Sequence, residues 1–395
     1  MRTALCFLST NDRAVVACVR SLVRRGVPVR LIPKRGAPPD PFRFTAYASR
    51  TDRKRPYADP SDPVRFHDSL LQIFKTYPES VILPTGEALI RGLFEEEALL
   101  RRFGVTLPVP DPDLYHRVSD KGSFVRWMAE NDFPVPPRIT RSPAIRDVPF
   151  VIKPEKGVLN GQKQFPPVLV LDRSDYRRRK ALIGRPDVFF QKWLPGDSYY
   201  YCALYRRGER ILYFTQRNLV QQPHGKSIIR AAPCRLPRSL CGRVDDIISE
   251  TRWSGPLMME FRLHENRYYA IEINPRLWGP LQLALDNGVD FPCALYRLSV
   301  DGMFDVPDPG TYVPSSGRGY LWISGYVQGM LLKTGPKGRF QRFRPAGKNT
   351  MPFRDVWFRP DTWVFGCLEG LFVLVKWILS RTRRTAPEKP GFHDV

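Results

Sequence analysis

The sequence predicts a mixed fold in which an α/β unit is followed by an α+β unit, and three features of its 395 residues support this. The chain begins with a short apolar run, a stretch with helical spacing and a second apolar run, the order found in a βαβ unit of a parallel sheet. After about residue 149 the pattern changes to strand-forming runs joined by tight turns, as in antiparallel sheets. A long apolar stretch near residue 370 predicts a helical extension at the C-terminus.

The charge balance narrows the classes of partner. Lys and Arg outnumber Asp and Glu by 62 to 39, which gives a net charge of +23. Such an excess favours phosphorylated ligands or an anionic membrane surface, unless it only reflects an arginine-rich composition. The basic residues are scattered and do not alternate with aromatic residues, so we expect no nucleic-acid partner.

The cysteines and the N-terminus indicate a reducing compartment. The seven cysteines form no CxxC pair and no zinc spacing, so they are expected to be free thiols. The first residues, MRTALCFLSTNDRAVV, lack the apolar length and cleavage motif of a signal peptide and fit a first strand instead. We therefore expect a cytoplasmic protein.

Residues 1–105 are expected to form an N-terminal α/β domain. Its first predicted elements are a strand at 3–9, a helix at 12–25 and a strand at 27–32. The turn before the helix contains no GxGxxG, so a dinucleotide site is poorly supported. A later strand, in SVILPTGE, ends at Thr85 and Glu87, at the edge of a parallel sheet where ligands bind. Both are candidate ligand contacts, although capping of the next helix is the simpler interpretation.

The stretch LMMEFRLHENRYYAIEINPR predicts a hairpin with an acidic face. A three-residue turn at 265–267 would place Glu260 opposite Glu272, with Asn274 beside them. Two carboxylates this close require a positive charge between them, and two carboxylates with an amide suit Mg²⁺. Arg276 is next on the same face and could reach a phosphate. The alternatives are a solvated strand face, or a two-residue turn that puts Glu260 on the opposite face.

Two lysines occupy positions that a phosphate would explain. Lys153 ends an apolar strand in FVIKPEKG, where its head could meet a phosphate or simply reach solvent. Lys121 follows Asp120 at the start of a predicted helix, where the helix dipole is positive. An anion bound at that N-terminus would account for the lysine, whereas an exposed lysine needs no partner.

Five blocks in a fixed order carry a family resemblance. They are Lys121 in SDKGSF, Lys153 in VIKPEKG, QKWLPGDSYY at 191–200, MMEF at 258–261 and IEINPRLWGP at 271–280. This order resembles the ATP-grasp superfamily, and within it the carbamoyl-phosphate-synthase-like, carboxylate–amine ligase branch, over about residues 80–300. The resemblance implies a Rossmann-like pre-ATP-grasp domain at 1–105, a two-lobed ATP-grasp domain at 106–300 with its smaller lobe at about 135–192, and an extension at 301–395.

The resemblance also implies roles for individual residues. Lys121 and Lys153 match the basic residues that contact the ATP phosphates. Arg276 matches the arginine that steadies the phosphoryl group, so Arg276 and Lys153 are the implied catalytic residues. The Mg²⁺ ligands, for which Mn²⁺ could substitute, correspond to Glu260, Glu272 and Asn274. The adenine-reading hinge corresponds to Gln191, Lys192, Trp193 and Leu194, although the family usually has Glu where Gln191 stands. The usual ribose-binding Glu is replaced by Ser198, next to Asp197. The loop after Lys153 is expected to close over ATP with Gly157 and Gly161 as hinges.

The implied reaction is the ATP-dependent joining of a small carboxylate to a small amine through an acyl phosphate. His224 and Arg217 are weak candidates for the acceptor site, because relatives place a substrate-side loop there. A rival interpretation is a non-catalytic, nucleotide-binding scaffold subunit, which the presence of the implied site residues argues against.

The C-terminal extension contains an apolar helix expected at about 362–380. Glu369 and Lys376 are seven residues apart, so they share one narrow polar stripe. This helix could lie at an anionic membrane surface, pack on the protein or on a second copy in a homodimer, or span a membrane. A peripheral position at the inner face of the membrane would suit a second possible reaction, amidation of a uronic-acid or lipid-linked glycan.

Overall fold

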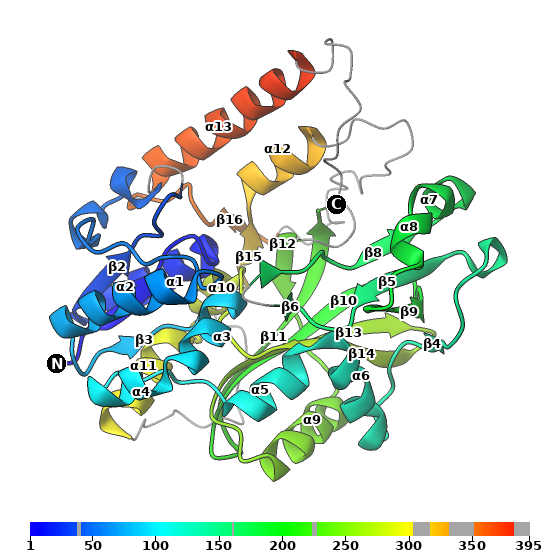
Figure 1. Cartoon of the computed structure of the whole chain (residues 1–395), viewed down its shortest axis with the longest axis horizontal. Helices are drawn as coiled ribbons and strands as arrows, with labels where there is room; N and C mark the ends of the chain where they lie inside the picture. The colour runs from blue at the N-terminus through cyan, green and yellow to red at the C-terminus, as the bar shows by residue number, and fades with distance from the viewer. Residues whose placement is uncertain (38–40, 160–161, 223–226, 303–316, 332–350, 383–395) are drawn as a thin grey trace.

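The computed structural model describes residues 1–37, 41–159, 162–222, 227–302, 317–331 and 351–382 (Figure 1). Within these ranges the strands form a three-stranded, a four-stranded and a seven-stranded sheet, together with a two-stranded ribbon. The three-stranded sheet is parallel and the four-stranded sheet is antiparallel. The predicted combination of an α/β unit with an α+β unit is confirmed.

The N-terminal domain is built on the predicted βαβ start. Its parallel sheet has the order β2-β1-β3, and its strands are β1 (Ala4–Phe7), β2 (Val29–Ile32) and β3 (Val81–Ile82). Helix α1 (Asp12–Arg24) joins β1 to β2 and buries its apolar face. The other helices of this region are η1 (Pro41–Phe44), η2 (Ala48–Arg50), α2 (Pro63–Thr76), α3 (Glu87–Glu95) and α4 (Glu97–Arg102). Asp62 caps α2 by accepting from the backbone N–H of Arg65 at 3.2 Å.

The four-stranded sheet falls in the residues expected for the smaller lobe. Its order is β4-β9-β5-β8, with β4 (Arg138–Ile139), β5 (Phe150–Pro154), β8 (Val168–Val170) and β9 (Val188–Lys192). The same stretch of chain contains the ribbon of β6 (Val158–Leu159) and β7 (Gln162–Lys163) and the helices α7 (Arg173–Arg178) and α8 (Lys180–Ile183). The preceding helices α5 (Pro112–Ser119) and α6 (Lys121–Glu130) contact each other and strand β14 (Arg267–Asn274) of the largest sheet. The alternating residues Phe150 and Ile152 of β5 are fully buried in its own small core.

The seven-stranded sheet forms the centre of the molecule. Its order is β14-β13-β10-β11-β12-β15-β16. The strands are β10 (Ser198–Arg206), β11 (Glu209–Gln221), β12 (Ile228–Pro233), β13 (Gly255–His264), β14 (Arg267–Asn274), β15 (Gly319–Leu321) and β16 (Phe353–Asp355). Three helices of this region are α9 (Arg238–Glu250), α10 (Leu281–Asp286) and α11 (Phe291–Asp301). Strands β15 and β16 come from beyond residue 301, so the C-terminal region adds two strands to this sheet besides its helices.

One apolar core joins the N-terminal domain, the large sheet and the C-terminal region. It contains residues from all three, including Val15, Trp278 and Trp357. An ion pair joins the N-terminal domain to the segment before the C-terminal helix, because the buried Arg20 of α1 donates to the carboxylate of Asp361. The same guanidinium donates to the carbonyl of Val356 at 2.8 Å. The position of the C-terminal helix is therefore fixed relative to the N-terminal domain.

The predicted apolar helix is α13 (Trp363–Thr382), which lies at the edge of the molecule beside α12 (Ile323–Leu331) (Figure 1). Glu369 points inward, where its carboxylate accepts from the hydroxyl of Ser324. The side chain of Lys376 lies outside the described residues. Among the helices that the structure describes, none has the length and apolar character needed to cross a membrane.

Candidate active site

The β13–β14 hairpin has a two-residue turn. His264 pairs with Arg267, which leaves only Glu265 and Asn266 in the turn. Both have positive φ, 47° and 58°, as the tightest hairpin turns require, and Asn tolerates this conformation well. The expected three-residue turn at 265–267 is therefore wrong.

The expected pairing of Glu260 with Glu272 is nevertheless present. The register runs regularly from the turn to Phe261 opposite Ala270 and then shifts, so that Glu260 lies opposite Glu272. Ile271 is the extra residue of a β-bulge. Because a shift of one residue moves side chains to the other face of a strand, the bulge brings the two carboxylates to the same face.

The two carboxylates have different electrostatic surroundings. Burial and the charge of Glu272 raise the pKa of Glu260, which also accepts from the hydroxyl of Ser198 at 2.8 Å. Burial alone would raise the pKa of Glu272 too, but the charges of Lys121, Lys153 and Arg276 and a hydrogen bond from Asn274 hold it below its usual range. Glu272 is thus kept ionised, and a further cation would stabilise the charged form of Glu260.

Lys153 lies beneath this acidic pair. It belongs to β5 and is 6% exposed, and its ammonium donates to the carbonyl of Ile271, the bulge residue, at 3.5 Å. Burial lowers its pKa to about 8, against the opposing effect of Glu272. A buried ammonium of this kind gains more from a bound anion than an exposed one.

Arg276 and Asn274 form a chain of hydrogen bonds that ends at Glu272. A guanidinium nitrogen of Arg276 donates to Asn274 Oδ1 at 3.0 Å, and Asn274 Nδ2 donates to Glu272 Oε1 at 2.9 Å. The Asn274 amide is held between a cation and a carboxylate, so its oxygen is oriented toward the basic side.

Lys121 is the first residue of α6, as predicted, and Asp120 is its N-cap residue. The Asp120 side chain makes no capping bond to the helix. It accepts instead from Arg91 at 2.7 Å and from the backbone N–H of Gly157 at 3.2 Å. The start of α6 is thereby tied to the loop that follows Lys153.

The residues predicted to form the adenine-reading hinge include a buried acceptor. Gln191 of β9 is 1% exposed and donates through Nε2 to the carbonyl of Pro136 at 3.0 Å. Its Oε1 is buried and has no hydrogen-bond partner among the described residues. A buried acceptor without a partner is costly, so this oxygen is suited to a ligand that can donate.

These residues line one cavity of about 390 Å³. Of the residues predicted for the nucleotide and metal, its walls include Lys121, Lys153, Gln191, Lys192, Trp193, Leu194, Glu260, Glu272, Asn274 and Arg276. Arg262, Gln221 and Pro136 also line it and were not predicted. The hydrogen bond from Gln191 to Pro136 depends on the pairing of β4 with β9, which no local pattern indicates.

Asp197 and Ser198 lie outside this cavity. They line a separate hollow of about 140 Å³, where the Asp197 carboxylate is 3.9 Å from Arg217. Ser198 is buried and faces Glu260 across the sheet. Arg217 therefore lies near the predicted ribose position, whereas His224 and Gly161 fall outside the described residues.

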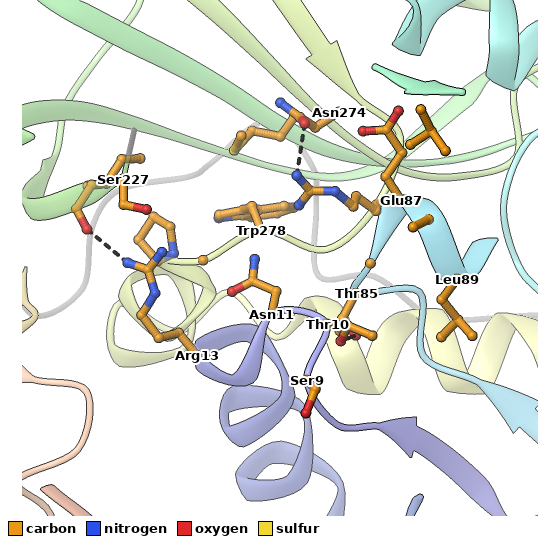
Figure 2. Close-up of a pocket in the computed structure, with 18 of the residues that line it drawn as sticks. Ser9, Thr10, Asn11, Arg13, Thr85, Glu87, Leu89, Ser227, Asn274 and Trp278 are labelled. Atoms are coloured by element: carbon orange, nitrogen blue, oxygen red, sulfur yellow. Dashed lines mark hydrogen bonds between the residues drawn. The ribbon is translucent and has the colours of Figure 1, made fainter. Parts of the chain in front are cut away.

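A second and larger cavity, of about 740 Å³, adjoins the first. The two share the wall formed by Glu87, Gln221, Glu260, Glu272, Asn274 and Arg276. Figure 2 shows the opposite side, where Ser9, Thr10, Asn11 and Arg13 come from the loop after β1 and the start of α1. Thr85 and Glu87 line this cavity, as their position at a strand end suggested. Ligands tend to bind at the C-terminal ends of parallel strands, and this rule applied to β1 would also have indicated residues 9–13.

A network of ion pairs connects the two cavities. Arg91 of α3 is buried and donates to Glu87 at 3.0 Å and to Asp120 at 2.7 Å. Asp120 accepts from the N–H of Gly157, while a side chain placed on Gly157 would come within 2.9 Å of Glu87. The loop beside the first cavity therefore packs against a residue that lines the second. We call Glu87, Arg91, Asp120 and Gly157 the interdomain network.

No family model matches the sequence, and neither does any curated protein. Solved structures do resemble the chain. Pyruvate carboxylase of Rhizobium etli aligns over 78% of this chain at 15% identity and a TM-score of 0.57, but the chain spans only 31% of that protein. The biotin carboxylase domain of 2-oxoglutarate carboxylase from Hydrogenobacter thermophilus was solved with MgADP and bicarbonate. It aligns over 75% of this chain and 69% of its own, at 15% identity and a TM-score of 0.55. Phosphoribosylamine–glycine ligase of Thermotoga maritima aligns over 78% of both chains at 15% identity and a TM-score of 0.53. At these identities the likeness is one of fold.

Proposed function

We propose that this chain, which has the ATP-grasp fold, is an ATP- and Mg²⁺-dependent ligase that joins a carboxylate to an amine through an acyl phosphate. The resemblance drawn from the sequence is confirmed at the level of the fold, and enzymes of this fold are ATP-dependent ligases. The choice of a carboxylate and an amine as the substrates is our proposal, because fold does not fix function.

The first cavity suits ATP. The Gln191 Oε1, which is buried and has no partner among the residues described, can accept from the adenine amino group, with the 192–194 segment alongside. Lys121, Lys153 and Arg276 provide three cations near the carboxylate pair, where the phosphates would lie. The buried Lys153 in particular gains a partner for its charge when a phosphate binds.

The carboxylates of Glu260 and Glu272 suit a divalent cation with oxygen ligands, such as Mg²⁺. For Asn274 to join them its amide must turn over, because its Nδ2 and not its Oδ1 faces Glu272. Among the described residues, no three His, Cys, Asp or Glu side chains are grouped to hold a metal by themselves. Mg²⁺ typically takes few protein ligands and completes its shell with water and phosphate oxygens, which fits this small donor set. When bound, the ion would neutralise charge on the phosphates.

One observation carries the proposal of ligation: the two cavities meet at Glu272, Asn274 and Arg276. A carboxylate in the second cavity would lie next to the phosphates in the first. Arg276, held by Asn274, is then positioned to neutralise the charge of the group in transfer. The protein needs no nucleophile of its own, because its residues position and neutralise the reactants.

The test is a screen for ATP turnover with pooled carboxylates, including bicarbonate, and pooled amines. We expect ADP and phosphate release that requires both a carboxylate and an amine. With the carboxylate alone, ATP labelled with ¹⁸O at the β–γ bridge should scramble its label, because acyl phosphate forms reversibly. A protein that binds Mg–ATP but neither scrambles nor hydrolyses it with any pool would be the scaffold subunit instead.

A further inference from the structure

The outer face of α13 is apolar. Six large apolar side chains of this helix are exposed, with Trp363 at 57% and Leu371 at 56%; they are Trp363, Val364, Leu368, Leu371, Phe372 and Val375. At about 100° per residue they occupy roughly 180° of the helix circumference, so they form one continuous strip. We call these six residues the α13 strip. Soluble proteins seldom expose contiguous apolar surface of this kind without a use for it.

The helix cannot turn this strip inward, because its opposite face is fixed to the protein. Phe365 is buried against Trp357, with ring centroids 4.5 Å apart. Gly366 lies so close to Trp357 that an added side-chain carbon would come within 3.2 Å of it. Glu369 points inward and accepts from Ser324 of α12. The inner face of α13 thus carries a carboxylate beside the buried Phe365, while apolar side chains also line the outer face.

The charge near the strip indicates what covers it. After Glu369 the next acidic residue is Glu388, and the intervening sequence contains Lys376, Arg381, Arg383 and Arg384. The helix therefore combines an outward apolar strip, which includes a Trp, with basic residues in the sequence of its last two turns and directly after it. Helices that lie in the interface of anionic membranes combine the same two features. A second copy of the chain would bring a second basic cluster of the same sign.

We propose that α13 docks this protein on an anionic lipid surface, with the strip in the interface and the basic residues at the lipid headgroups. The helix lies on the membrane and does not cross it. This proposal is independent of the reaction, because it rests on residues that line neither cavity.

The test uses the full-length protein with vesicles of phosphatidylcholine, alone or mixed with phosphatidylglycerol. We expect flotation with the mixed vesicles only, and loss of flotation at high salt, where the basic cluster is screened. The double variant Leu368→Glu and Leu371→Glu should weaken binding about tenfold or more, because it places charge in the strip. Val64→Glu is the matched control, since Val64 is 73% exposed on α2, and it should bind as the wild type does.

A probe on Cys367 gives a second readout. Cys367 is the exposed cysteine of the described chain, and an environment-sensitive fluorophore attached there, in a Cys234→Ser background, should shift to the blue with mixed vesicles. Absence of flotation with both vesicle types would overturn the proposal. So would a concentration-dependent dimer in sedimentation that the double variant abolishes while vesicle binding is unchanged, because the strip would then be an interface between copies.

Discussion

Glu260 and Glu272 lie opposite each other across β13 and β14 because Ile271 forms a bulge between Glu272 and the turn. The same bulge residue offers its carbonyl to the ammonium of Lys153. One irregularity in a hairpin therefore places two carboxylates and a buried lysine within a single site. Burial and the charge of Glu272 raise the pKa of Glu260, whereas nearby cations, Lys153 among them, hold the pKa of Glu272 below its usual range.

Replacing Glu272 by Gln should abolish most ATP turnover and leave the fold intact. The change removes the carboxylate that Lys121, Lys153 and Arg276 keep ionised, and with it a predicted metal ligand. We expect kcat to fall by about 10²–10³-fold, and the Mg²⁺ concentration for half-maximal rate to rise. Glu265→Gln, at an exposed turn position of the same hairpin, should be neutral. Full activity of Glu272→Gln would refute the metal assignment.

Gln191→Met should reduce the preference for adenine. Met has a similar volume, so the fold should tolerate it, but it cannot accept from an amino group as the buried Gln191 Oε1 can. The measurement is kcat/KM for ATP against ITP, which has an oxygen in place of the amino group. We expect the ratio of kcat/KM for ATP to kcat/KM for ITP to fall about tenfold, which corresponds to the loss of one hydrogen bond. An unchanged ratio with a raised KM for both nucleotides would mean that Gln191 only supports the fold.

Arg91→Met should weaken both stability and turnover. It leaves the carboxylates of Glu87 and Asp120, which are 20% and 13% exposed, without their shared cation. Breaking a largely buried pair in this way costs roughly 3 kcal/mol. Because Asp120 also holds the N–H of Gly157, we expect kcat to fall at saturating ATP even well below the unfolding temperature.

The matched control for Arg91→Met is Arg101→Met. Arg101 pairs with Glu97 at 3.5 Å in the same i,i+4 arrangement, but both side chains are largely exposed. Exposed pairs contribute little, so this variant should be close to the wild type in urea unfolding and in turnover. Equal losses in the two variants would show that the interdomain network has no special role.

Local patterns predicted much of this molecule, and long-range contacts supplied the rest. The alternation of Glu272, Asn274 and Arg276 follows from strand periodicity, so their common side was predictable. The bulge at Ile271 was not, because register depends on the turn and on the partner strand, and the pairing was expected from a turn that does not form. Ser198 was expected at the ribose, but its pairing with Arg262 turns it toward Glu260.

Glu369 makes the stability of the protein depend on pH. Burial raises its pKa from 4.5 to about 7, although bonds from Ser324 and Trp322 and the charge of Arg13 oppose this. The folded state therefore holds this proton more tightly than the unfolded chain does. The stabilising effect of protonated Glu369 is complete below the pKa that this group has in the unfolded chain, and it is lost as the pH rises through about 7.

The variant Glu369→Gln removes this dependence while keeping the shape of the side chain. We expect it to unfold at the same urea concentration as the wild type near pH 4.5, and to be more stable at pH 8 by up to about 3 kcal/mol. Glu250→Gln, at the exposed end of α9, should have the same stability as the wild type at both pH values. The physical reason is that Glu369 at pH 8 is a largely buried anion, and Arg13, whose charge favours its ionised form, is also engaged with the Trp322 ring and the Ile228 carbonyl. Equal stability of Glu369→Gln and wild type at pH 8 would mean that α13 releases this carboxylate to water before the chain unfolds.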